Sequence, residues 1–141
     1  MPGVPVRLKY LKPKPFPDSP HTLGEHLKKR RLELGLTQVQ VSERLHISSA
    51  TVLNWEADRT PPAVGHGPAI LAFLGYDPAP EPETLTERMR ALRRANGWTI
   101  ARAARHLKVD PGTWGEWERT GRIAWPRYRS LVEVFLKAVD I

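Results

Sequence analysis

The residue types that most often carry catalysis or hold metals are few in this sequence and lie far apart. Cysteine is absent, which removes thiolate nucleophiles, thiolate metal ligands and disulfides together. The histidines, at positions 21, 26, 46, 66 and 106, are scattered, and no Gly-rich phosphate-binding loop is present. Glu116 and Glu118 stand two residues apart, so their carboxylates diverge on a helix. We therefore expect no enzyme activity, no metal site and no cofactor.

Charge is the more informative property of the chain. Its 141 residues include 22 Lys and Arg against 15 Asp and Glu, a formal net charge of +7. A basic chain favours a polyanionic partner, with nucleic acid ahead of an acidic membrane surface or an acidic protein. No apolar run approaches the roughly 20 residues of a membrane span, and the first residues lack the apolar core of a signal peptide. We expect a cytoplasmic protein that does not enter a membrane.

The sequence contains an internal repeat. When it is shifted by 62 residues, positions 22–74 align without a gap and give 12 identities in 53 positions. Arg31 falls on Arg93, and Trp55-Glu56 falls on Trp117-Glu118. A duplicated unit of this size indicates one fold used twice.

Helix-capping signals divide each repeat into short helices. Thr22 with Glu25 and Thr37 with Gln40 have the spacing of capping boxes, and Ser48 can cap a third helix. Pro68 suits the first turn of a fourth helix, and the second repeat has corresponding signals. We predict an all-α protein: a Pro-rich basic arm (1–20), a four-helix domain (21–75), a Pro-rich linker (76–83) and a second domain (84–141).

The segment 32–56, LELGLTQVQVSERLHISSATVLNWE, resembles the helix-turn-helix of the lambda-repressor-like (Cro/repressor, XRE type) family. The second repeat shows the same resemblance more weakly, so the chain resembles a tandem pair. The resemblance implies that the third helix of the unit enters the major groove of DNA. It also implies that Gln38 bonds a phosphate, and that buried pairs join Arg31 to Glu56 and Arg93 to Glu118.

The third predicted helix carries residue types that can recognise bases. Asn can pair with adenine, Ser can serve either base type, and Ala can touch a thymine methyl group. Ser49 and Asn54 lie broadly opposite Val52 and Trp55, which we expect in the core, while Thr51 and Arg59 could hold phosphates. The predicted DNA-binding residues are Gln38, Ser48, Ser49, Ala50, Thr51, Asn54, Arg59, Arg102 and Arg105.

The second repeat departs from this pattern. Ile100 replaces Gln38, Glu116 replaces Asn54, and Gly112 and Gly115 lie within the third helix. An acidic, Gly-containing helix suits base recognition poorly, yet Arg102 and Arg105 suit a phosphate clamp. Both turns before the third helix carry a residue other than the family's usual Gly, namely His46 and Lys108.

These observations predict a sequence-specific DNA-binding protein, a bacterial transcriptional regulator, whose partner is double-stranded DNA. The first domain would read bases and the second would contact phosphates. The alternative is an antitoxin-like interaction protein whose second repeat (84–141) docks a protein partner. The sequence leaves the oligomeric state open. A monomer in which the two repeats form an intramolecular pseudo-dimer is one possibility.

Overall fold

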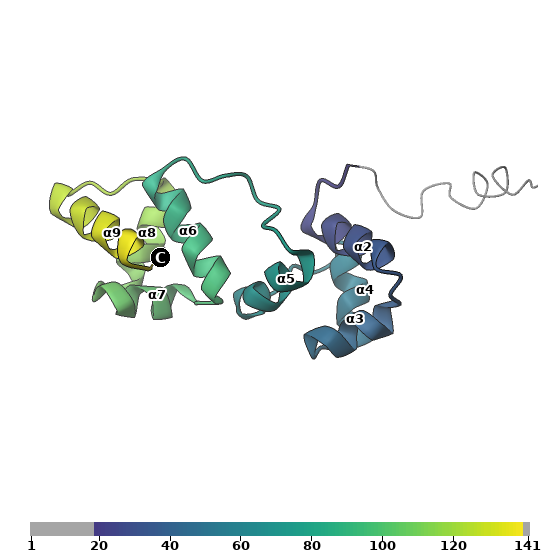
Figure 1. The fold of residues 1–141 in the computed structure, drawn as a ribbon. Coiled ribbons are helices and arrows are strands. Elements are labelled where there is room, and N and C mark those ends of the chain that lie inside the picture. The colour runs from purple at the N-terminus through teal and green to yellow at the C-terminus, as the bar shows by residue number, and fades with distance from the viewer. Residues whose placement is uncertain (1–18, 140–141) are drawn as a thin grey trace, which may run out of the picture. The chain divides into compact units, whose positions relative to one another are not determined.

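The computed structural model describes residues 19–139, and in this range every regular element is helical (Figure 1). The predicted all-α class is therefore confirmed for the described residues, whereas most of the predicted N-terminal arm lies outside them. The helices are α2 (Leu23–Glu33), α3 (Gln38–Leu45), α4 (Ser49–Glu56), α5 (Gly67–Leu74), α6 (Leu85–Asn96), α7 (Ile100–Leu107), α8 (Pro111–Thr120) and α9 (Pro126–Val139), with a short 3-10 helix, η1 (Val64–His66), before α5.

The first compact unit ends at Pro61 and contains α2, α3 and α4. Both predicted capping boxes form: the Thr22 hydroxyl accepts from the Glu25 amide, and the Thr37 hydroxyl accepts from the Gln40 amide. Because α4 packs against both other helices, its inward side chains Val52 and Trp55 are buried.

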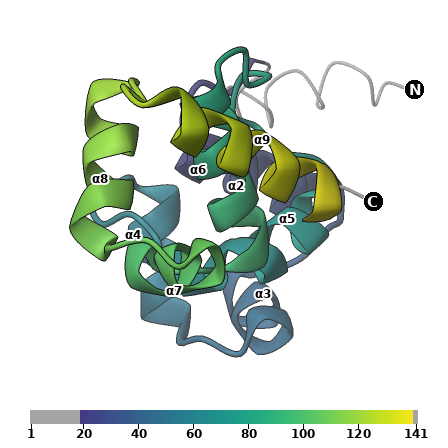
Figure 2. The same ribbon diagram turned by 90° about the vertical axis from the view of Figure 1, so that its left-hand side faces the viewer.

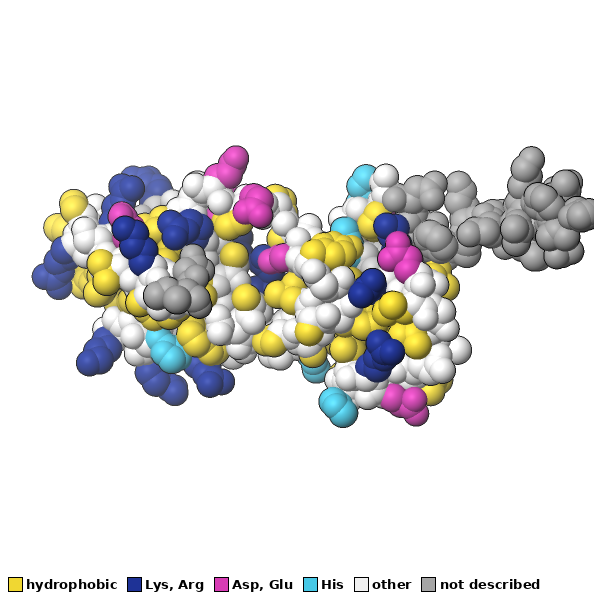
Figure 3. Space-filling view, viewed as in Figure 1, with side chains coloured by type: hydrophobic (Ala, Val, Ile, Leu, Met, Phe, Trp, Pro, Cys, Tyr) yellow, Lys and Arg dark blue, Asp and Glu magenta, His cyan; other side chains and the backbone are white. Residues whose placement is uncertain are grey.

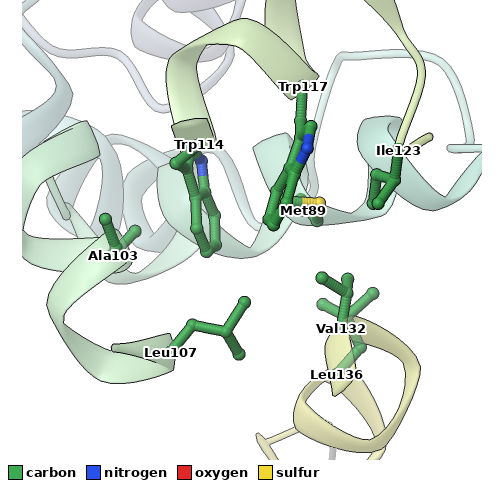
Figure 4. Close-up of a cluster of buried hydrophobic side chains, with 9 residues drawn as sticks. Met89, Ala103, Leu107, Trp114, Trp117, Ile123, Val132 and Leu136 are labelled. Carbon is green, nitrogen blue, oxygen red and sulfur yellow. The ribbon is translucent and has the colours of Figure 1, made fainter. Parts of the chain in front are cut away.

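The second unit, from Pro62 onward, has a core formed by α6 to α9. In Figure 4 the two indoles of α8, Trp114 and Trp117, project toward the side chains of the neighbouring helices. Trp114, Met89 and Val132 are the largest fully buried side chains. Figure 2 shows α9 lying across this unit, and it contacts both α6 and α7. The second repeat therefore has a complete helical core of its own.

Helix α5 packs on α6, which lies in the second repeat of the sequence. Two glycines permit this approach. A Cβ atom added to Gly67 would lie 2.2 Å from the Arg94 carbonyl oxygen, and one added to Gly97 would lie 3.0 Å from Pro68. The compact units thus divide at Pro61, whereas the sequence placed the domain boundary after residue 75.

The turns before α4 and α8 adopt the left-handed backbone expected of this motif. His46 has φ 58° and ψ 46°, and Lys108 has φ 60° and ψ 39°. Both residues act as the C-cap of the preceding helix, and their amides donate to carbonyls of that helix. Non-glycine residues adopt this region at a modest energetic cost, so the two turns keep the geometry without glycine.

Candidate nucleic-acid interface

Helix α4 presents a short uncharged surface on the side away from its buried residues. Ser48 caps the helix, and its hydroxyl accepts from the Thr51 amide and hydrogen-bonds the Thr51 hydroxyl at 2.8 Å. Ser49 and Ala50 are exposed, while Asn54 and Thr51 are half-buried. The helix therefore exposes small and amide side chains together with the apolar Leu53, and carries no charged group between Ser49 and Asn54. Small and amide side chains can approach base edges closely.

Asn54 has a specific neighbour at the end of the helix. The Arg59 guanidinium donates to the Asn54 side-chain oxygen at 3.3 Å, and the Arg59 amide donates to the Asn54 carbonyl at 2.9 Å. Asp58, just before Arg59, has φ 59°, which turns the chain back toward the helix. Its carboxylate accepts from the Thr22 hydroxyl at 2.9 Å. The exposed Arg59 side chain is therefore placed beside Asn54.

Behind this surface lies the predicted pair of Arg31 and Glu56. The guanidinium donates two hydrogen bonds to the carboxylate, of 2.6 and 3.0 Å, and a third to the Leu36 carbonyl at 3.0 Å. Gln38 donates to the same carboxylate at 3.1 Å. The resemblance implied a phosphate contact for Gln38, but here its amide nitrogen is engaged within the protein.

The second repeat holds the equivalent pair. Arg93 donates to Glu118 at 2.8 and 2.9 Å and to the Trp98 carbonyl at 3.3 Å. The Trp114 indole donates to the same carboxylate at 2.6 Å. Burial raises the pKa of Glu118, but the hydrogen bonds from Arg93 and Trp114, with the positive charges of Arg93 and Arg90, outweigh it and leave that pKa below its usual value.

The outer face of α8 differs in chemistry from that of α4. Glu116, at the position of Asn54, is exposed and pairs with Arg119. Asp110 caps the helix, so two carboxylates lie on this side. An open hollow of about 690 Å³ lies beside it, lined in part by Trp117, Trp125 and Tyr128. Carboxylates repel phosphates, so this face is poorly suited to base recognition.

The basic residues predicted in the second repeat lie on a neighbouring helix. Arg102 and Arg105 are both exposed on α7, whose remaining face buries Ala103, Ala104 and Leu107. Figure 3 shows Lys and Arg side chains (dark blue) projecting at several places around the α6–α9 part of the chain. Exposed guanidinium groups on one helix face can donate hydrogen bonds to phosphate oxygens.

Comparison with known protein families matches residues 27–80 to the family described as Helix-turn-helix and residues 84–140 to the one described as Helix-turn-helix domain. The chain carries two tandem helix-turn-helix domains. The first is of the XRE or lambda-repressor type, which confirms the resemblance. The matches support a DNA-binding role in transcription regulation. No curated protein and no solved structure matches the chain.

The helix-turn-helix families matched here are typically non-enzymatic. Among residues 19–139 no group of three His, Asp or Glu side chains could hold a metal ion. No helix in that range is both long enough and apolar enough to span a membrane.

The hydrogen bonds that Gln38 and Trp114 make to the two carboxylates, and the bond from Arg59 to Asn54, were not predicted from the sequence. A signal for the first two was present. The repeats differ at two aligned positions together, Gln38 with Val52 and Ile100 with Trp114. At these two positions each repeat thus has one side chain that can donate a hydrogen bond, Gln38 in the first and Trp114 in the second. This pattern indicates that the donor to the carboxylate has moved from one position to the other. Nothing in the repeat pattern could indicate the Arg59 contact, because Gly121 stands at the aligned position.

Proposed function

We propose that this helix-turn-helix protein is a sequence-specific regulator of transcription. In this proposal the first domain reads bases in the major groove through α4, and the second holds the phosphate backbone. The observation that supports this division is the contrast between the two aligned helices. Helix α4 exposes Ser49 and Ala50 beside Asn54. In α8 the position of Asn54 is occupied by Glu116, a carboxylate that pairs with Arg119.

The proposed base contacts come from the exposed N-terminal half of α4 and from Asn54. Ser48 and Thr51 hydrogen-bond each other at the helix start, where backbone amides can also meet a phosphate. Gln38 lies at the first turn of α3, and its amide nitrogen carries a second N–H, besides the one that donates to Glu56, that can donate to a phosphate. We assign Gln38 to positioning the α3–α4 pair on DNA.

The experiment that tests base reading is the substitution Asn54→Ala in the full chain, after the preferred site has been selected from random duplexes. We expect a loss of about 1–3 kcal/mol on the preferred site, base preference relaxed at one position, and little change on random DNA. Glu43→Ala, an exposed change on α3, is the control. Equal weakening of specific and random binding would contradict the assignment of Asn54 as a base reader.

A second function is supported by one observation on the second domain. Trp125 is 69% exposed beside the hollow next to α8, and Tyr128 lines the same hollow. Exposed aromatic side chains of this kind are typical of protein interfaces. The alternative is therefore an antitoxin-like regulator whose second domain docks a protein. Trp125→Ala should then weaken capture of that partner and leave DNA binding unchanged.

A further inference from the structure

The contact between Arg59 and Asn54 bears on which base the first domain selects. It rests on the proposed function, in which Asn54 faces the major groove. A free Asn side chain offers one acceptor and two donors, and so pairs with adenine, which presents the N7 acceptor and the N6 donor. Any group that engages the side-chain oxygen of Asn54 changes this preference.

Arg59 engages that oxygen. Its guanidinium has only donors, so the atom that it meets at 3.3 Å must be the Asn54 oxygen, and the amide nitrogen must point elsewhere. The guanidinium therefore uses one lone pair of the oxygen and brings its positive charge close to that atom. An adenine N6 amine is itself a donor, so its approach to the remaining lone pair would be disfavoured by this neighbouring charge.

The backbone holds Arg59 in this position. The Asp58 residue has a left-handed backbone, and the Arg59 amide donates to the Asn54 carbonyl at 2.9 Å. The Asp58 carboxylate is in turn held by the Thr22 hydroxyl of the α2 cap. Helix α2 lies close at this point, because a Cβ atom added to Gly24 would lie 2.2 Å from the Trp55 carbonyl oxygen. Arg59 is thus placed by the fold as well as by its own side-chain contact.

We propose that Asn54 and Arg59 act together as a donor-only pair that selects guanine. Guanine presents two acceptors in the major groove, N7 and O6, and no donor at those positions. The Asn54 nitrogen can meet one acceptor and a free guanidinium N–H the other. Arg59 then contacts the base itself and also engages the acceptor of Asn54, in place of the simple phosphate contact that the sequence predicted for it.

The test uses the full chain and duplexes that differ only at the base pair whose preference Asn54→Ala removes. The parent protein should prefer guanine over adenine there by about tenfold. Arg59→Met should lower that guanine-to-adenine affinity ratio by about tenfold, because the Asn54 oxygen becomes free to accept from adenine N6. Arg59→Lys, which keeps a cationic donor, should retain most of the guanine preference.

Arg44→Met is the matched control, because Arg44 is another exposed arginine, near the end of α3 in the same unit. It should weaken binding to both duplexes without changing their ratio. A parent that prefers adenine at this pair, or an Arg59→Met variant with an unchanged ratio, would overturn the inference alone. A parent chain that selects no sequence at all would overturn the proposed function together with this inference.

Discussion

The two helix-turn-helix repeats hold the same Arg–Glu pair but complete its hydrogen bonds from different helices. In the first repeat the extra donor is Gln38, at the start of α3. In the second it is Trp114, on α8 itself, while Ile100 stands at the Gln38 position. In both repeats the glutamate carboxylate thus accepts a third hydrogen bond, in addition to the two from the arginine. Between the repeats, that donor thus changes from a half-buried amide near the surface to a fully buried indole.

This exchange has a consequence for the surface. A buried carboxylate needs several hydrogen bonds, because an unsatisfied charge is costly in the protein interior. Once Trp114 supplies the donor from within the core, position 100 needs no polar side chain, and Ile100 instead packs against the buried cluster. The second repeat thereby gains an apolar side chain packed against its core. It also loses a polar group at the place where the first repeat meets DNA in our proposal.

Removal of the carboxylate should give the largest difference in stability between the two repeats. Glu118→Ala strands Arg93 and the Trp114 indole, and should lower the free energy of unfolding of the second unit by about 3–5 kcal/mol. Glu56→Ala should cost the first unit less, because Gln38 is half-buried and can turn to water. Amide hydrogen exchange assigned to each unit measures the two losses separately, since the units need not unfold together.

Glu43→Ala and Glu116→Ala are the controls for these variants, because both glutamates are exposed. Each should change the free energy of unfolding by less than about 0.5 kcal/mol. If Glu56→Ala and Glu43→Ala gave equal protection against exchange, the Arg31–Glu56 pair would contribute nothing to the first unit.

The next effect tests the exchanged donor itself. Trp114→Phe keeps an aromatic ring in the core but removes the indole N–H, which should cost the second unit about 1–3 kcal/mol. Ile100→Gln, placed in the same background, returns the donor used by the first repeat and should recover part of that loss. A double-mutant cycle measured by hydrogen exchange gives the coupling between the two positions. Additive losses would mean that the amide introduced by Ile100→Gln does not reach Glu118.

Much of this architecture is predictable from the sequence. The capping boxes at Thr22 and Thr37, with the corresponding box at Thr84, follow from local spacing and from the repeat, and the structure confirms them. The two Arg–Glu pairs were implied by the family resemblance, and both pairs are present in the structure. The packing of α5 on α6 was not predictable. It depends on the close approach of Gly67 to the Arg94 backbone, and a glycine before a helix also fits an ordinary loop.

The residue types of the candidate site were predictable from the sequence, but the hydrogen-bond partners of those residues were not. Periodicity places Asn54 away from Val52 and Trp55, and this holds in α4. Which atoms Asn54 offers depends on Arg59, whose position follows from the left-handed backbone at Asp58 and from the Thr22 contact. Those are tertiary features that no spacing rule specifies.

A smaller effect tests whether the basic helix of the second unit meets DNA. Replacing Arg102 and Arg105 with Ala should make the slope of log K against log salt shallower by up to roughly 2, because each phosphate contact contributes about 0.9. Binding to specific and random duplexes should fall by similar factors, in contrast to Asn54→Ala. Salt titrations of both duplexes measure this.

The control for that experiment is Glu116→Asn, which gives α8 the side chain that α4 has and should not abolish binding. Suppose instead that the double Arg variant kept the salt slope of the parent. The second unit would then not lie on DNA, and the interaction surface around Trp125 would become its better assignment.

The smallest effect compares the two helix caps. Thr22→Ala and Thr84→Ala each remove a hydroxyl that accepts from an amide of the first turn, which costs about 0.5–2 kcal/mol. Thr22 also donates to Asp58, whereas the Thr84 hydroxyl lies 3.4 Å from that of Thr86. Thr22→Ala should therefore cost more, and should also loosen the turn that places Arg59, with Thr22→Ser retaining both properties. Amide exchange in α2 and α6 measures the two losses, and a greater loss for Thr84→Ala would show that the contact with Asp58 does not stabilise the first unit.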